Sequence, residues 1–387
     1  MIVRQFLHWV HSAPAGERAE AAGALARAYI LSDLSSDDRA AVEGAMIMLL
    51  DDPSPLVRRA LAQDLAASRR APPAVIHALA NDQPDIAAIV LERSALFLDA
   101  DLVELVATGA PKVQAAIARR TALPRTVAAA IAEVGAAETC LTLIENSAAE
   151  IARFSISRMV ERFGHLAAIR EALLARTGLP ASIRQTLALR LADALANFVA
   201  ARAWIDGGRA RRIATEACEK ATVMIAASAG DREVRSLVRH LRASAQLNAG
   251  LLLRALLSGN VVLFEEALAD LANLPLARVR AIVRAGRAPA FRALYHRAGL
   301  PASAYPAFRE AVAAMGEASY FGGLGGSGRL KRRMIERVLA GCGPQEVGDV
   351  EPLLMLLRRF ATEAAREEAR LYCEQLAGDD AIDRAAA

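Results

Sequence analysis

The sequence has few aromatic residues for a chain so rich in apolar ones. Phe, Trp and Tyr make up only 4% of the 387 residues, although 54% of the chain is hydrophobic. The apolar content is carried by Ala and Leu, which are strong helix formers, and the period-two alternation of β-strands is almost absent. These absences argue against a β-rich fold and predict an all-α chain.

Long apolar runs are also missing. Arg, Asp or Glu interrupts every Ala/Leu-rich segment before it reaches the roughly 18 to 20 residues that cross a bilayer. The first ten residues have neither the basic n-region nor the long apolar core of a secretory signal. We therefore expect a cytoplasmic protein without a transmembrane segment.

Cysteine is scarce and scattered. Cys140, Cys218, Cys342 and Cys373 form no CxxC pair and have no histidine at ligand spacing. Neither a disulfide framework nor a zinc site is indicated by this pattern. We expect the four cysteines to be buried thiols.

Recognisable catalytic motifs are absent as well. His8 and His11 are near neighbours in sequence, but no acidic third ligand lies beside them. Neither a Gly-x-Ser-x-Gly elbow nor an HExxH motif occurs. The sequence therefore identifies no catalytic, cofactor-binding or metal-binding residue, and a non-enzymatic role is favoured.

A recurring turn is the strongest positive signal. Residues 49–57 read LLDDPSPLV and residues 79–87 read LANDQPDIA, which aligns Leu56 with Ile86. Asp, Asn or Ser ends one helix and caps the next, and Pro is tolerated in the first turn. Leu56 and Ile86 are expected to begin the buried stripe of the second helix.

Weaker copies extend this pattern to about residue 164. They place Val113 and then Ile151 in the role of Leu56, so the copies recur at uneven intervals, of which the last is the longest. Such spacings fit two-helix units of uneven length that must stack on their neighbours to bury both apolar faces.

The run from Asp52 to Ala62 resembles the DPxxxVRxAxA signature of HEAT and leucine-rich-variant repeats. The signature arginine is present at Arg58 and Arg153, whereas Ala88 and Ala115 replace it in the middle copies. The resemblance implies an α-solenoid of the kind that scaffolds other macromolecules. The longer layout, including residues 251–301, also resembles an uncharacterised alphaproteobacterial family of unknown function, which implies no activity.

Beyond about residue 180 the repeat signal fades. We predict a HEAT-like repeat region over residues 1–180, a helical region over 181–377 that continues the solenoid or forms a bundle, and a frayed tail over 378–387. Gly207-Gly208 is interpreted as a helix stop. The expected long helices of this half cover residues 182–206, 209–229, 231–258 and 261–271.

Positive charge concentrates in the middle of the chain. Residues 201–297 contain 16 Arg or Lys against 8 Asp or Glu. Such a surface attracts an anionic partner if its side chains converge on one face. The glycine-rich run 322–328 lacks the GK[ST] ending of a phosphate-binding loop and is interpreted as a surface loop. The candidate contacts with an anion or a partner are Arg209, Arg211, Arg212, Arg278, Arg280, Arg284, Arg287, Arg329, Lys331, Arg332 and Arg333.

Three functions are consistent with these patterns. The favoured one is a non-enzymatic scaffold that binds a protein partner through a solenoid surface. The alternative is nucleic-acid binding through the basic helices of residues 201–297. A third is a HEAT-like base-processing enzyme, with Asp206 as its carboxylate beside Trp204, although Trp204 is expected to be a helix-packing anchor. The sequence does not indicate an oligomeric state.

Overall fold

The computed structural model describes residues 9, 12–320, 335–340, 355, 357–366, 368–370 and 373. Within these residues every regular element is a helix, so the predicted all-α fold class is confirmed. None of the described helices is both long enough and apolar enough to cross a bilayer. The chain divides into two compact units, which we call unit 1 (Met1–Leu179) and unit 2 (Pro180–Ala387).

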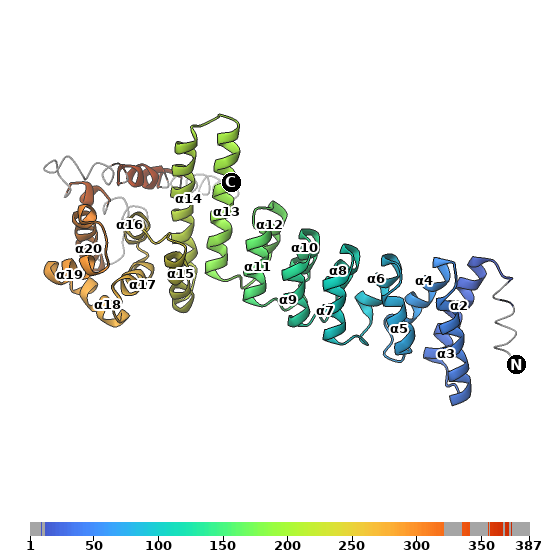
Figure 1. Ribbon diagram of the computed structural model, residues 1–387. Coiled ribbons are helices and arrows are strands. Elements are labelled where there is room, and N and C mark those ends of the chain that lie inside the picture. The colour runs from blue at the N-terminus through green and yellow to red at the C-terminus, as the bar shows by residue number, and fades with distance from the viewer. Residues whose placement is uncertain are drawn as a thin grey trace, which may run out of the picture. The chain divides into compact units, whose positions relative to one another are not determined.

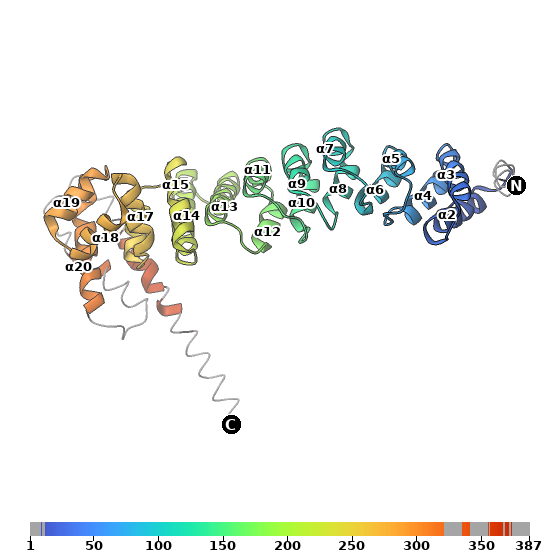
Figure 2. The ribbon, with the colours of Figure 1, turned by 90° about the horizontal axis from the view of Figure 1, so that it is seen from below.

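Unit 1 is a row of antiparallel helices in two layers (Figures 1 and 2). In the first layer each of α2, α4, α6, α8, α10 and α12 packs on the next. The second layer contains α3 and α5, followed by α7, α9 and α11. This solenoid-like stacking buries one side of every helix against its neighbours. The helices are α2 (Ala15–Leu31), α3 (Ser36–Leu50), α4 (Pro55–Leu65), α5 (Pro73–Ala80), α6 (Pro84–Arg93), α7 (Asp99–Thr108), α8 (Pro111–Ala118), α9 (Arg125–Val134), α10 (Ala137–Glu145), α11 (Arg153–Phe163) and α12 (Ala167–Ala175).

The first-layer helices recur at nearly regular intervals along the sequence. From α4 onwards they begin at Pro55, Pro84, Pro111, Ala137 and Ala167. Proline opens three of these helices, at the position where its missing N–H leaves no helical hydrogen bond unmade. The repeat is therefore more regular in the structure than the turn motif suggests.

The predicted alignment of Leu56 with Ile86 is wrong by one residue. Leu56 is 53% exposed, whereas Val57 and Ile86 are fully buried. The reason is that two residues separate Asp52 from the helix-opening proline in the first copy, and only one separates Asp82 from it in the second. The buried stripe of α4 therefore begins at Val57.

The predicted fourth copy is also out of register. Ile151 is only partly buried and precedes α11, which belongs to the second layer. The first-layer helix that follows α8 is α10, which begins at Ala137. The interval from Val113 to Ile151 is long because Val113 belongs to a first-layer helix, whereas Ile151 precedes a second-layer helix.

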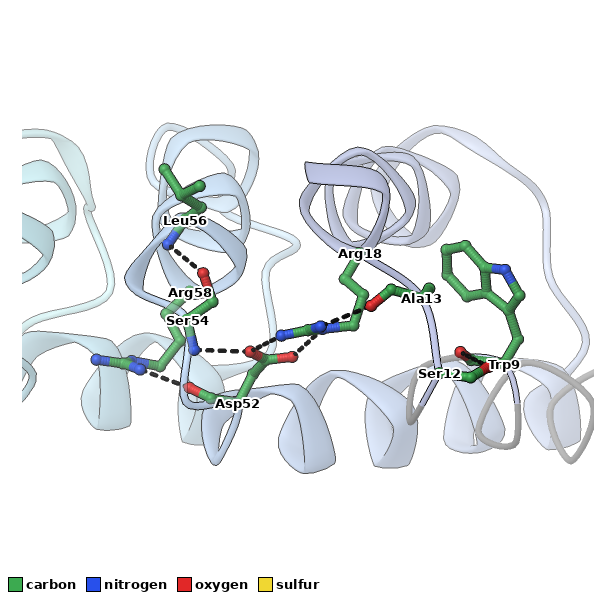
Figure 3. Close-up of polar contacts among 8 residues, drawn as sticks. All are labelled: Trp9, Ser12, Ala13, Arg18, Asp52, Ser54, Leu56 and Arg58. Atoms are coloured by element: carbon green, nitrogen blue, oxygen red, sulfur yellow. Dashed lines mark hydrogen bonds and ion pairs between the residues drawn. The ribbon is translucent and has the colours of Figure 1, made fainter. Parts of the chain in front are cut away.

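Asp52 joins the first repeats by side-chain hydrogen bonds (Figure 3). Its carboxylate accepts two hydrogen bonds from Arg18, both of 2.8 Å, and one of 2.8 Å from the backbone N–H of Ser54. The guanidinium of Arg18 holds the pKa of Asp52 below its ordinary value. Arg58 donates to the Asp52 carbonyl at 2.5 Å and to the Asp82 carboxylate at 2.6 Å. The arginine–aspartate contact therefore recurs in the next repeat.

Farther along unit 1 the cross-links run to backbone carbonyls. The guanidinium of Arg120 donates to the carbonyls of Leu91 and Ser94 in the preceding repeat. The side-chain amide of Asn146 donates to the carbonyls of Ala118 and Arg120 at 2.8 Å each. These long-range bonds satisfy carbonyls that the helix ends leave without a partner.

Unit 2 begins with the same alternate stacking and ends as a bundle. Helix α13 packs on α14 and α15, α14 packs on α16, and α15 packs on α17. The remaining helices gather around α16 and α17, whose Leu252 and Phe264 are fully buried. The helices are α13 (Ala181–Ala201), α14 (Gly207–Ala227), α15 (Asp231–Ala243), α16 (Ala249–Leu257), α17 (Val261–Ala272), α18 (Leu276–Ala285), α19 (Ala288–Arg297), the 3-10 turn η1 (Ala302–Ala304) and α20 (Tyr305–Tyr320), with helical residues also at 335–340 and 357–366.

The long helix predicted over residues 231–258 is in fact two helices, α15 and α16. Ala245 adopts a left-handed conformation with φ of 55°. The N–H of Gln246 donates a hydrogen bond to the Leu241 carbonyl at 2.8 Å, and the N–H of Ala245 donates one to the Arg242 carbonyl at 3.1 Å. This Schellman arrangement ends α15, and the side chain of Asn248 then caps α16.

The cysteines follow the predicted burial only in part. Cys140 and Cys218 are buried, and burial raises the pKa of the Cys140 thiol to about 11. Cys373 is exposed, so the prediction is wrong at that position. Cys342 lies outside the described residues, as does the predicted tail 378–387.

Replacing Asp52 by Asn should lower the thermal midpoint of unfolding at pH 7, by a margin that shrinks in acid. A depressed carboxyl pKa contributes stability above the unfolded-state value of about 3.9, and this stability is lost as the pH falls through the folded-state value. The measurement is a set of thermal melts of the full chain from pH 2 to 7. Asp51→Asn is the matched control, since Asp51 is exposed. An equal destabilisation by both variants would contradict the assignment.

Replacing Ala245 by Gly should raise the free energy of unfolding by about 1 kcal/mol, because glycine adopts the left-handed region without the steric cost of a Cβ. Ala243→Gly, in the last turn of α15 itself, should lower it by roughly 0.5–1 kcal/mol. Urea unfolding followed by circular dichroism measures both. Changes of the same sign would show that the backbone at Ala245 is not strained.

Candidate interaction surfaces

The first group of predicted arginines lies at the beginning of α14. Arg209, Arg211 and Arg212 are exposed. The helix starts at Gly207 because the carboxylate of Asp206 accepts hydrogen bonds from the N–H groups of Gly208 and Arg209, at 2.9 and 3.1 Å. The glycine pair predicted to stop a helix therefore opens one.

This cap bears on the base-processing hypothesis. The Asp206 carboxylate accepts hydrogen bonds from the N–H groups of the helix start, which gives it a capping role. Trp204, which was expected to anchor helix packing, is 66% exposed. The prediction of a packing role for Trp204 is therefore wrong.

The second group of predicted arginines lies on and after α18. Arg278 and Arg284 are exposed, and Arg287 is the N-cap residue of α19. Arg280 is paired with the carboxylates of Glu265 at 3.0 Å and Asp231 at 3.8 Å.

The two groups occupy different parts of unit 2. Helix α18 packs on α17 and α19, and both views place it apart from α14 (Figures 1 and 2). The two groups therefore lie on different helices of unit 2. The remaining predicted contacts, Arg329, Lys331, Arg332 and Arg333, lie with the glycine-rich run outside the described residues.

Metal-ligating side chains do not cluster in the part of the chain that the structure describes. No group of three or more His, Cys, Asp or Glu side chains there is arranged to hold an ion. His8 and His11 lie outside the described residues.

Unit 1 carries an open groove of about 700 Å³ along α10 and α12. Three alanines of α12, at positions 168, 172 and 175, share one side of that helix through their spacing. Their small side chains leave room beside Leu141 and Ile144 of α10. The lining residues are Leu141, Ile144, Glu145, Ser147, Ala168, Glu171, Ala172, Ala175, Arg176 and Thr177.

The groove is lined by two carboxylates and one guanidinium, so its net charge is negative. Glu145 and Glu171 are both exposed, and neither forms an ion pair within the described residues. Glu145 is also the last residue of α10, where the helix dipole places its negative end. This arrangement favours a ligand with a cationic group.

Arg176 shapes the end of the groove. Its guanidinium donates hydrogen bonds to the carbonyls of Ile144 at 2.7 Å and of Asn146 and Ala149 at 3.0 Å. These bonds fix the chain after α12 to the turn that follows α10. The guanidinium at this end of the groove is thus already engaged with backbone carbonyls.

Unit 2 contains a buried charged cluster that the sequence patterns did not reveal. Arg254 is only 6% exposed and lies 2.7 Å from Glu363, 3.7 Å from Glu219 and over the ring of Phe360. Lys220 also pairs with Glu363, at 3.0 Å. Burial raises the pKa of Glu219 despite the nearby guanidinium. The cluster fastens the helical residues 357–366 to α14 and α16 and is therefore structural.

Comparisons with known proteins identify a bacterial family. No curated protein and no solved structure matches the chain. Residues 86–347, about two thirds of the chain, match a family described as an uncharacterised protein conserved in bacteria (DUF2336). This chain, with its stacked helices of unit 1 and the bundle of unit 2, belongs to that bacterial family.

Proposed function

We propose that this protein is a non-enzymatic interaction scaffold that binds a protein segment in the groove along α10 and α12. The observation that supports the proposal is the open cavity of about 700 Å³ on the repeat array of unit 1, lined by aliphatic side chains and edged by two carboxylates. Stacked helical repeats generally use such extended surfaces to hold other macromolecules.

The chemistry of the lining defines the segment that fits. Leu141 and the three alanines offer apolar contact, while Glu145 and Glu171 offer ion pairs at the rim. A segment with small apolar residues next to a Lys or Arg satisfies both demands. We place this interaction in the cytoplasm, in line with the sequence-based expectation.

A photo-crosslinking amino acid placed at position 168 should capture the bound segment, because Ala168 lines the groove. The full chain carrying it is irradiated in bacterial cells, and the adduct is resolved by mass. Ala172→Trp, which fills the groove, should reduce the adduct about tenfold or more.

The matched control carries the same amino acid at Glu104, an exposed position of α7 outside the groove. No adduct at position 168, or one that persists undiminished when the groove is filled, would refute the proposal.

Nucleic-acid binding is the second candidate. It is supported by Arg209, Arg211 and Arg212, which are exposed at the start of α14 and form no ion pair within the described residues. Neutralising phosphates releases condensed counterions, so binding of this kind weakens steeply with salt.

The double variant Arg211→Glu/Arg212→Glu should abolish the gel shift of labelled single-stranded RNA at 50 mM salt. The affinity of the unmodified chain for this RNA should fall about tenfold or more between 50 and 200 mM salt. Arg93→Glu in unit 1, another exposed arginine, is the control. A complete lack of binding at low salt would exclude this function.

A further inference from the structure

The hairpin formed by α13 and α14 leaves an apolar strip uncovered. Leu191, Leu195 and Phe198 are exposed at i, i+4 and i+7 on α13, and Trp204 follows in the turn. This spacing places the three α13 side chains on one side of the helix over about two turns, roughly 10 Å. We call Leu191, Leu195, Phe198 and Trp204 the hairpin strip.

The turn that ends α13 fixes the position of Trp204. Ala203 is left-handed with φ of 54°, the N–H of Trp204 bonds to the Val199 carbonyl at 3.2 Å, and that of Ala203 bonds to the Ala200 carbonyl at 3.0 Å. This Schellman arrangement brings the indole against Phe198, edge to face, with ring centroids 5.8 Å apart. The contact covers only part of both rings, so the strip keeps apolar area to offer a partner.

Positive charge gathers at the Trp204 end of the hairpin strip. The guanidinium of Arg202 lies 3.8 Å over the ring of Phe198 and 5.4 Å from that of Trp204. Arg209, Arg211 and Arg212 are exposed on the first turns of α14, next to the same turn. From residue 190 to residue 213 there are five arginines and two aspartates, and one aspartate, Asp206, caps the helix.

We propose that the hairpin strip is a second docking site, independent of the groove on unit 1, and that it takes an acidic amphipathic helix of a partner protein. Apolar side chains of that helix at i, i+4 and i+7 cover Leu191, Leu195 and Phe198, as in helix-in-groove recognition. Its carboxylates face the arginines at the Trp204 end of the strip. Trp204 and Arg202 form the aromatic and cationic anchor at one end, since these residue types dominate binding energy in interfaces.

The charge distribution selects this occupant over a second copy of the chain. A two-fold contact offers the hairpin only its own surface, in which arginines outnumber aspartates five to two from residue 190 to residue 213, so a second copy supplies no excess of carboxylates. Single-stranded nucleic acid satisfies the charge, but it stacks on open ring faces. One face of Phe198 is already covered by Arg202, and aliphatic Leu191 and Leu195 offer no stacking.

The probe is a fluorescein-labelled helical peptide of about 14 residues, four turns long, with Leu at i, i+4, i+7 and i+11 and Glu on its flanks. A matched peptide has Lys in place of every Glu. Fluorescence anisotropy of each peptide is followed as the full chain is added. The acidic peptide should bind at least about tenfold more tightly than the basic one, and its affinity should fall with salt.

Variants of the strip separate a specific site from general stickiness. Leu195→Ser and Trp204→Ser should each weaken binding of the acidic peptide about tenfold. Leu31→Ser is the control, because Leu31 is an exposed leucine of unit 1, and it should leave binding unchanged. Trp204→Phe should retain affinity within about threefold, since an aromatic anchor remains. All of these positions are exposed, so the thermal midpoint is expected to stay the same.

Several results would overturn the assignment. Equal affinity for the two peptides would remove the role of charge, and unchanged binding by Leu195→Ser and Trp204→Ser would remove the role of the strip. Tighter binding of oligouridine or of phosphatidylglycerol vesicles, with the same dependence on these two positions, would assign the strip to nucleic acid or to a lipid surface instead.

Filling the groove by Ala172→Trp should not alter peptide binding at the hairpin.

Discussion

The short helices of unit 1 depend on one another. From α4 to α12 each helix has only 8 to 11 residues, and isolated helices of this length do not persist in water. Each is stabilised by the helices stacked on either side of it, and polar side chains such as Asp52, Arg120 and Asn146 tie one repeat to the next. The helices α10 and α12, and with them the groove that they line, therefore depend on packing between neighbours more than on helix propensity.

The sequence predicted the fold class well because the signals for helices are local. Asp-Pro turns, an Ala/Leu-rich composition and the lack of alternating apolar and polar residues can be recognised without tertiary contacts. The register of Leu56 was missed because turns of unequal length precede α4 and α6. The break at Ala245 was missed because neither glycine nor proline marks it, and a left-handed alanine has no sequence signature.

The surfaces were harder to predict than the helices. Leu191, Leu195 and Phe198 have the spacing of a buried stripe, and only the structure shows that this part of α13 is uncovered. Arg280 and Arg254 are basic residues in the sequence, but in the structure glutamates from other helices form ion pairs with them. A count of basic residues therefore overestimates the positive surface of residues 201–297. The four arginines beside the hairpin strip have no such partners within the described residues.

The turn between Asp52 and Pro55 has a consequence for how such arrays vary. It holds one residue more than the turn between Asp82 and Pro84, yet both aspartates meet an arginine of the preceding repeat and both prolines open a first-layer helix. The turn absorbs the difference locally, so the helices on each side keep their packing. Insertions at these turns change the length of a repeat without changing the surface that the array presents, which leaves the loops free to diverge while the grooves stay in place.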